Sequence, residues 1–475
     1  MGGAPGLGRG PRPDPRAAVH VLLPADLLLL LPRQARHRLA GRRRPGQRHL
    51  RDRLPARRLD LPAHQGGRPR PRPGPRRRDG LQADARQRHP HARPRHRLMD
   101  LSYTAEEEEF RARLREWLAA ELPGLPPRPD PLDWPGRRAY DCGWQRRLYD
   151  AGYGHVHWDA SPTQRLIFLE ETERAGAPYV GANFVGLLHA GPTIAAEGTP
   201  GQRERWLEPV LRGDEVWCQG FSEPGAGSDL ASLRTRAVRD GDAYVVTGQK
   251  IWTSHAEVAD WCELLVRTDP EGPRHRGISW LALRMDAPGV TVRPLRTLAG
   301  STEFAELFLD EVRVPVSHRV GEENDGWRVT MVTLSFERGT AFVGEVVACR
   351  RLLGELARAA RENGTWDDPA LRRRLGALAA RFQALWRLTQ RNVSEAQATG
   401  GVPGTGGSVF KLDYSHARQE LYDAAADVLG PDALDLGREW NLDRLSSLSY
   451  TIAAGTSQIQ RNIVAERILG LPKGR

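Results

Sequence analysis

The composition of the chain changes sharply at residue 99, and this change limits how much of the chain can fold. Residues 1–98 contain 25 Arg and 6 Asp but no Lys, Glu, Phe, Trp or Tyr. A segment without aromatic side chains, rich in Pro and Gly, buries too little apolar surface to offset the entropy that it loses on ordering. We therefore expect residues 1–98 to be disordered and residues 99–475 to fold.

The basic charge of the chain also belongs to residues 1–98. The 475-residue chain has a formal net charge of +11, of which residues 1–98 contribute +19, so residues 99–475 carry −8. The high isoelectric point is therefore no sign that the folded region binds nucleic acid.

Three interpretations of residues 1–98 stay open. Arg, Pro, Gly, Ala and His without Lys or Glu are typical of translated GC-rich upstream DNA, which makes Met99 the expected start of the protein. A basic tail that contacts nucleic acid or acidic lipid is the second. A signal or anchor at residues 21–31 is the third, although that apolar run is interrupted by Pro and Asp and is too short to span a bilayer.

The cysteines favour a reduced, cytoplasmic protein without a metal site. They lie far apart, with neither a C-x-x-C pair nor a His spacing suited to zinc. We expect each to be a small buried hydrophobic residue rather than a nucleophile. They are Cys142, Cys218, Cys262 and Cys349.

Hydrophobic periodicity predicts three consecutive domains, and so a multi-domain α+β protein. Thr104 and Glu107 form a capping box that opens a mainly α-helical domain over 99–215. Short alternating runs between Gly and Asp turns predict a β-barrel-like middle domain over 216–318, with strands at 243–247, 262–266, 278–283, 290–292 and 307–309. Long helical patterns predict a four-helix bundle over 319–475, with helices at 327–362, 368–399, 408–430 and 439–469.

Three segments combine turn residues with groups that carry chemistry. Phe221-Ser-Glu-Pro-Gly-Ala-Gly-Ser-Asp229 predicts a tight turn that exposes backbone N–H groups and Ser228. Thr247-Gly-Gln-Lys-Ile-Trp-Thr-Ser254 follows about 25 residues later, and Ala454-Gly-Thr-Ser-Gln-Ile-Gln-Arg-Asn462 lies near the carboxyl terminus. In this order, on an α–β–α layout, the segments resemble the acyl-CoA dehydrogenase family over residues 99–475.

The resemblance implies an FAD enzyme that removes two hydrogens across Cα–Cβ of an acyl-CoA thioester. A base takes the α proton while the β hydride passes to flavin N5, which leaves the trans-2-enoyl-CoA. An aromatic plane beside the flavin excludes water, and hydrogen bonds to its polar edge favour the charge of the reduced ring. The implied flavin contacts are Phe221, Ser222, Gly227, Trp252, Ser254, Thr456 and Gln458. The implied substrate contacts are Arg338 and Ser228, although the resemblance also allows Ser228 to lie near the flavin phosphates.

The catalytic base departs from the common family pattern. In many members a Glu stands immediately before the Gly-Thr of the carboxyl-terminal motif, but this chain has Ala454, which cannot accept a proton. Leu334-Ser-Phe-Glu-Arg-Gly339 resembles the earlier helix that supplies the base in branched-chain and long-chain members. We therefore predict Glu337 as the base, with Arg338 beside it; a surface ion pair is the alternative.

The resemblance also implies an electron-transfer flavoprotein as electron acceptor, a homodimer or homotetramer, and a role in fatty acid β-oxidation. The family's Arg-x-x-Phe-Gly segment, which reaches the flavin of a neighbouring subunit, has no match at 360–366, so a heteromer stays open. Two rival functions also stay open: a non-catalytic partner subunit of a heteromeric acyl-CoA dehydrogenase, and a flavin monooxygenase or oxidase on the same fold. Short-chain, branched and steroid-side-chain thioesters all remain candidate substrates.

Overall fold

The computed structural model describes residues 103–473 apart from 179, 341–342, 399–405 and 436–438. The side chains of 336–340, 396–398 and 439 are also outside the described part. The expectations for residues 1–98, and for the side chains of Glu337 and Arg338, therefore concern residues that the structure does not describe.

The amino-terminal part consists of helices that begin at capping signals in the sequence. The Thr104 hydroxyl accepts a hydrogen bond from the Glu107 amide (3.2 Å), and the Thr104 amide donates to the Glu107 carboxylate (2.8 Å), as predicted. Ser161 and Thr199 begin later helices with the same capping box, each followed by Pro. The helices are α3 (Ala105–Glu121), α4 (Trp134–Asp150), α5 (Pro162–Arg174), α6 (Gly191–Glu197) and α7 (Pro200–Arg212).

The strands of the middle part form one sheet. In the order β6-β7-β3-β2-β4-β5-β8, neighbours are antiparallel except β2 and β4, and β1 pairs in parallel with β4. The five predicted strand segments lie within β3 to β7. The strands are β1 (Trp217–Gly220), β2 (Arg236–Asp240), β3 (Ala243–Ser254), β4 (Trp261–Arg267), β5 (Ile278–Arg284), β6 (Val290–Leu295), β7 (Phe304–Pro315) and β8 (Arg319–Val320).

The carboxyl-terminal part is helical, but the predicted helix over 439–469 is wrong. The helix ends at Ser447, and a 3₁₀ turn, η10 (Leu448–Thr451), follows it. Ala454 and Gly455 then take left-handed backbone angles, φ 53° and 83°, which a right-handed helix cannot contain. The helices are α8 (Gly326–Thr340), α9 (Val343–Glu362), α10 (Pro369–Ala398), α11 (Gly406–Leu429), α12 (Glu439–Ser447) and α13 (Ser457–Ile463).

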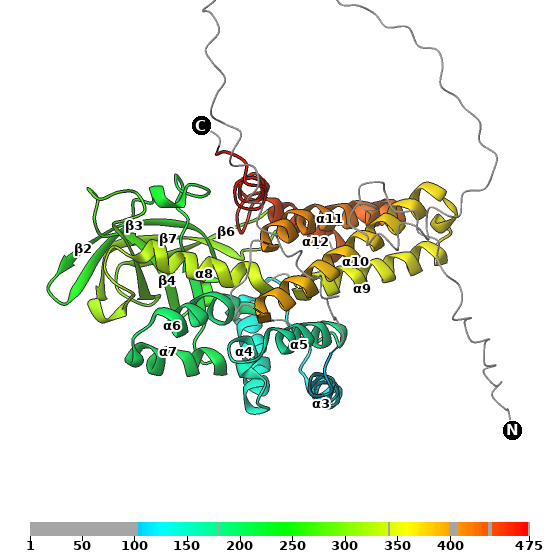
Figure 1. Cartoon of the computed structure of the whole chain (residues 1–475), viewed down its shortest axis with the longest axis horizontal. Helices are drawn as coiled ribbons and strands as arrows, with labels where there is room; N and C mark the ends of the chain where they lie inside the picture. Colours follow the sequence, from blue (N-terminus) through cyan, green and yellow to red (C-terminus); the bar gives the residue numbers. More distant parts are fainter. Residues whose placement is uncertain (1–102, 179, 341–342, 399–405, 436–438, 474–475) are drawn as a thin grey trace, which may run out of the picture. The chain divides into compact units, whose positions relative to one another are not determined.

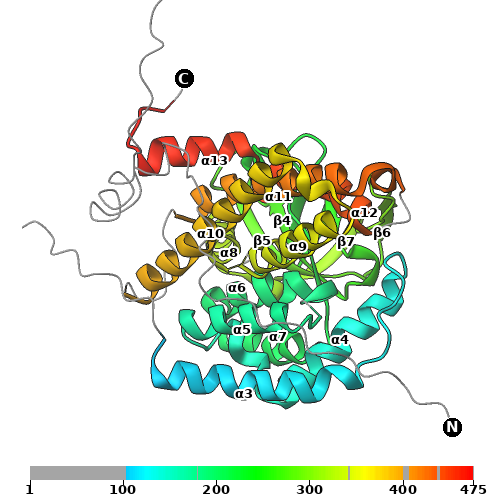
Figure 2. The ribbon, with the colours of Figure 1, turned by 90° about the vertical axis from the view of Figure 1, so that its right-hand side faces the viewer.

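The amino-terminal helices contribute to two hydrophobic cores. Leu114 of α3 and Ile167 of α5 are fully buried against the long helices α9, α10 and α11, which lie side by side (Figures 1 and 2). Trp206 of α7 instead packs against Trp217 and Trp261 of the sheet. The amino-terminal part therefore holds the sheet and the bundle to one another.

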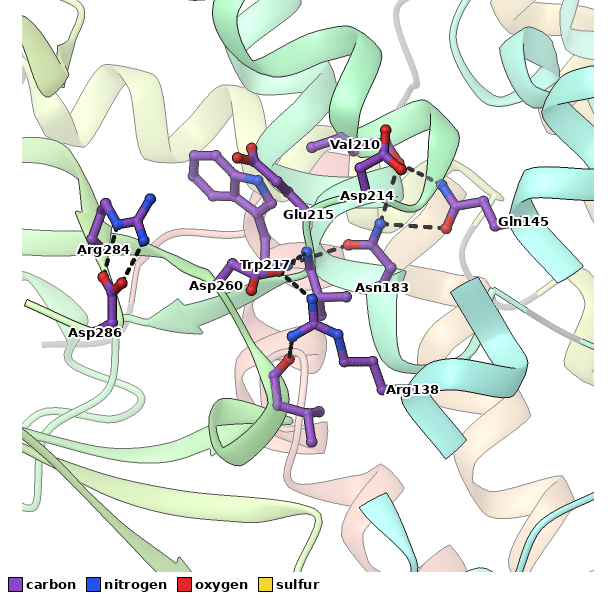
Figure 3. Close-up of polar contacts among 12 residues, drawn as sticks. Arg138, Gln145, Asn183, Val210, Asp214, Glu215, Trp217, Asp260, Arg284 and Asp286 are labelled. Atoms are coloured by element: carbon purple, nitrogen blue, oxygen red, sulfur yellow. Dashed lines mark hydrogen bonds and ion pairs between the residues drawn. The ribbon is translucent and has the colours of Figure 1, made fainter. Parts of the chain in front are cut away.

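Buried and half-buried polar groups fix the amino-terminal helices to the start of β1 (Figure 3). Asn183 is 1% exposed; its side-chain oxygen accepts from the Trp217 amide (3.3 Å) and its NH₂ group donates to the Val210 carbonyl (3.2 Å). Arg138 forms an ion pair with Asp260 (2.6 Å), whose carboxylate also accepts from the backbone at the residue before β1. These bonds set where β1 begins, and the first candidate segment follows β1.

Replacing Asn183 by Ala should lower the free energy of unfolding by about 1–3 kcal/mol, because it leaves the Trp217 amide buried without its partner. Urea unfolding followed by fluorescence measures this. Arg284→Gln, which breaks the exposed Arg284–Asp286 pair of Figure 3, is the control and should leave stability unchanged. Equal urea midpoints for the wild type and Asn183→Ala would show that the bond from the Trp217 amide to Asn183 does not stabilise the fold.

Candidate functional site

The segment after β1 forms the tight turn that the sequence predicts. The Glu223 amide donates to the Ala226 carbonyl (3.1 Å), and the Ala226 amide donates to the Glu223 carbonyl (3.0 Å). Phe221 is buried before the turn, whereas Gly227 and Ser228 are exposed after it. The turn thus presents a backbone edge and a hydroxyl to the outside.

A buried ion pair joins this turn to β3. The Lys250 side chain is fully buried, and its ammonium donates to the Glu223 carboxylate (2.9 Å) and to the Phe221 carbonyl (3.2 Å). Burial lowers the pKa of Lys250, although the charge of Glu223 offsets part of this. Burial also disfavours ionised Glu223, but Lys250 and the hydrogen bonds from Thr235 outweigh that and hold its pKa below the usual value.

Backbone pairing adds to this link, since the Ile251 amide donates to the Ser222 carbonyl (3.0 Å). The first two candidate segments are therefore in direct contact. Sequence reasoning did not identify Glu223 or Lys250, although both lie inside the segments that it singled out. The sequence did carry a signal for this pair: Lys250 is the only charged residue in the strand segment 243–254, and Glu223 offers an opposite charge in the turn.

The end of β3 is irregular and strained. The register against β7 shifts between Lys250 and Thr253, and Trp252, inside this bulge, has φ 63°. Trp252 is 58% exposed, and its ring touches Phe304 edge to face, with ring centroids 6.1 Å apart. The half-buried Ser254 pairs with Phe304 in the ladder. The bulge turns a large aromatic ring outward, where a planar ligand can cover it.

The carboxyl-terminal segment is strained as well. The Lys411 ammonium donates to the Gly455 carbonyl (2.6 Å), and the Gln460 side chain donates to the Ala454 carbonyl (3.0 Å). The Thr456 hydroxyl caps α13 by accepting from the Ile459 amide (3.2 Å). Gln458 is exposed on α13.

Left-handed backbone angles mark these segments. Of the five non-glycine residues with positive φ in the described part of the chain, three are Trp252, His255 and Ala454. Each such angle costs about 1–3 kcal/mol and is found preferentially at ligand sites.

The helix α8 includes residues 337 and 338. Its Thr333 shares a buried hydrogen bond with Thr193 of α6 (2.9 Å between the hydroxyl oxygens), which fixes α8 against the amino-terminal helices. Residue 337 is one helical turn further along this face of α8. Within the described residues, no group of three or more ligating side chains is placed to hold a metal ion. No helix of that part is long and apolar enough to cross a membrane.

The helix–sheet–helix order agrees with the class of flavoprotein dehydrogenases that the comparisons with known families identify. Family models of the acyl-CoA dehydrogenase amino-terminal, middle and carboxyl-terminal domains match residues 104–214, 218–312 and 324–469. The chain belongs to the acyl-CoA dehydrogenase family, an oxidoreductase family that uses FAD.

Named relatives support this membership over most of the chain. Acyl-CoA dehydrogenase IpdE1 of Mycobacterium tuberculosis is 40% identical over 386 residues, which cover 77% of this chain and 98% of that protein. The ChsE4–ChsE5 complex from Mycobacterium tuberculosis is 33% identical, with a TM-score of 0.67 over 79% of this chain and 100% of that chain. The Tcur3481–Tcur3483 steroid ACAD is 31% identical, with the same TM-score and coverage.

Replacing Lys250 by Met should lower the free energy of unfolding by about 3–5 kcal/mol, because Glu223 then stays buried as an uncompensated charge. Chemical denaturation checks this value. The double variant Glu223→Gln/Lys250→Met should recover part of the loss, since it buries no charge. If the double variant is no more stable than Lys250→Met alone, the pair does not hold the turn to β3.

Proposed function

We propose that this chain converts an acyl-CoA thioester to the trans-2-enoyl-CoA, with Glu337 as the base that removes the α proton. The observation that carries the dehydrogenase proposal is the exposed Trp252 ring at the strained end of β3, beside the turn after β1. The base is proposed at residue 337 because Ala454 stands where many family members have the catalytic Glu. Residue 337 lies on α8, which is fixed against α6. Arg338 beside it is proposed to bind the substrate.

FAD fits the residues that the three segments present, and when bound it supplies the hydride acceptor. The exposed Trp252 ring would cover one face of the isoalloxazine, and the Ser254 hydroxyl would bond to its polar edge. Phe221, Ser222 and Gly227 would contact the ring from the turn after β1. Thr456 and Gln458, at the start of α13, would hold the remainder of the cofactor.

The CoA end of the substrate would lie along Ser228. Arg274 forms an ion pair with Asp229, so the β4–β5 loop lies beside this serine. That loop carries Arg274, His275 and Arg276, all exposed. Sequence reasoning did not identify this loop. The loop is neutral overall, because Asp269 and Glu271 balance its two arginines, but the exposed Arg276 can donate to a phosphate of CoA.

A steroid-derived acyl group is the proposed substrate class, in preference to the ordinary fatty acyl-CoA that the sequence first implied. The support is similarity to a structure described as a steroid ACAD. Two of the similar structures are two-component complexes, so a heteromer with a second acyl-CoA dehydrogenase subunit is proposed in preference to a homodimer or homotetramer. An electron-transfer flavoprotein in the cytoplasm is the proposed electron acceptor.

Two other functions predict different outcomes when the FAD-loaded protein is mixed with acyl-CoA. A non-catalytic partner subunit, for which Ala454 is the favouring observation, would show no flavin reduction with any acyl-CoA. A monooxygenase or oxidase would consume oxygen rapidly after reduction and release no enoyl product.

Replacing Glu337 by Gln should slow flavin reduction by acyl-CoA about 10²–10⁴-fold, because the amide cannot take the α proton. Anaerobic stopped-flow bleaching of the FAD absorption measures the rate. Glu362→Gln, at the exposed end of α9, is the matched control and should react at the wild-type rate. If the Glu337→Gln variant binds FAD and its flavin is bleached at the wild-type rate, another group is the base.

A further inference from the structure

The last helical segment of the chain buries polar side chains and leaves apolar ones outside. α13 lies against α11 and continues as one turn of π-helix, η11 (Val464–Ile468) (Figures 1 and 2). The buried side chains of α13 are Ser457 and Gln460, whereas Ile459 and Ile463 lie one turn apart on another side of the helix. No residue of η11 is buried against the described part of the chain. A helix that packs into the core of its own domain shows the opposite pattern.

Exposed apolar residues gather in this region. Of the eleven large hydrophobic residues exposed in the described part, five lie within 448–471. No described residue after Tyr450 joins a hydrophobic core of the protein. Apolar surface gathered in this way is typical of a contact with another protein. The five residues, which we call the carboxyl-terminal surface, are Leu448, Ile452, Ile468, Leu469 and Leu471.

Basic residues accompany the carboxyl-terminal surface. Arg461, Arg467 and Lys473 are exposed, and none of them forms an ion pair with another described residue. Glu466 is the only acidic residue within 452–473, so this segment is basic although residues 99–475 carry −8 overall. Interfaces commonly combine an apolar centre with a charged rim. A complementary partner would therefore present an apolar groove bordered by carboxylates.

Charge and geometry distinguish between the possible occupants. In a two-fold symmetric dimer of this chain, the surface would meet itself, and its basic residues would face their own copies. Like charges brought together in this way oppose association. A helix that lies on lipid keeps its apolar residues on one helical face, whereas Leu448 and Ile452 precede α13 and Leu469 and Leu471 follow η11. A different protein chain fits both features better.

We propose that the carboxyl-terminal surface binds the second subunit of the heteromer, a different acyl-CoA dehydrogenase chain with carboxylates around an apolar groove. The inference rests on the proposed heteromer and names the surface through which it forms. Burial of the aliphatic side chains supplies the affinity, and the basic rim selects the partner.

The test co-expresses the tagged full chain with each other acyl-CoA dehydrogenase chain of its source organism. Complexes are quantified by size-exclusion chromatography with light scattering. The wild type should form a complex with one of these chains. Ile468→Asp/Leu469→Asp should weaken that complex at least about tenfold, because the contact would bury two carboxylates among apolar groups. Both replaced side chains are exposed, so circular dichroism should show an unchanged fold.

Two further variants complete the test. Val238→Asp on β2 is the matched control, since Val238 is 51% exposed and Leu469 is 64% exposed, and it should bind like the wild type. Arg461→Glu/Arg467→Glu should weaken the complex more at low salt than at high salt, because ions screen the charges of the rim.

A complex that Ile468→Asp/Leu469→Asp leaves unchanged would overturn the inference while the proposed heteromer stands. A wild-type chain that pairs only with itself, or that binds phosphatidylglycerol vesicles through these residues, would overturn it in favour of a second copy or of lipid. A chain that forms no complex with any of the co-expressed chains would contradict the inference and the heteromer together. Binding is measured without acyl-CoA, so these outcomes are independent of the proposed dehydrogenation.

Discussion

The buried contact between the Lys250 ammonium and the Glu223 carboxylate is the interaction on which the rest of the site depends. It ties the turn after β1 to the end of β3, and the same ammonium also binds the Phe221 carbonyl. Because both charges are buried, neither turn nor strand can shift without leaving one of them unpaired. The exposed Trp252 ring and Ser254 thus stand on a rigid base, which a flavin requires of its binding surface.

Strain in the backbone distinguishes this site from the surrounding fold. Trp252 and Ala454 hold left-handed angles that their side chains disfavour. At Ala454 the left-handed conformation is present although the carboxylate common in the family is absent. The base that we propose on α8 would serve the same reaction from a helix instead of from this turn.

Local signals in the sequence predicted much of the fold. Thr104 with Glu107 caps α3 as expected, and the alternating runs lie within β3 to β7. The break after Ser447 was missed because the left-handed angle at Ala454 leaves no trace in hydrophobic periodicity. Within the site, the segments were identified, but Trp252 and Phe304 lie far apart in the sequence and meet only because β7 pairs with β3. Such contacts depend on sheet register, which single-sequence patterns do not specify.

The central claim is that this flavoprotein dehydrogenates an acyl-CoA thioester. The most direct test mixes the FAD-loaded protein anaerobically with a panel of acyl-CoA thioesters, steroid-side-chain thioesters among them, and quantifies trans-2-enoyl-CoA against reduced flavin. The account predicts equal amounts of enoyl-CoA and reduced flavin, with a steroid-derived thioester reacting fastest. Flavin that stays oxidised with every thioester, or is reduced without an enoyl product, would contradict it.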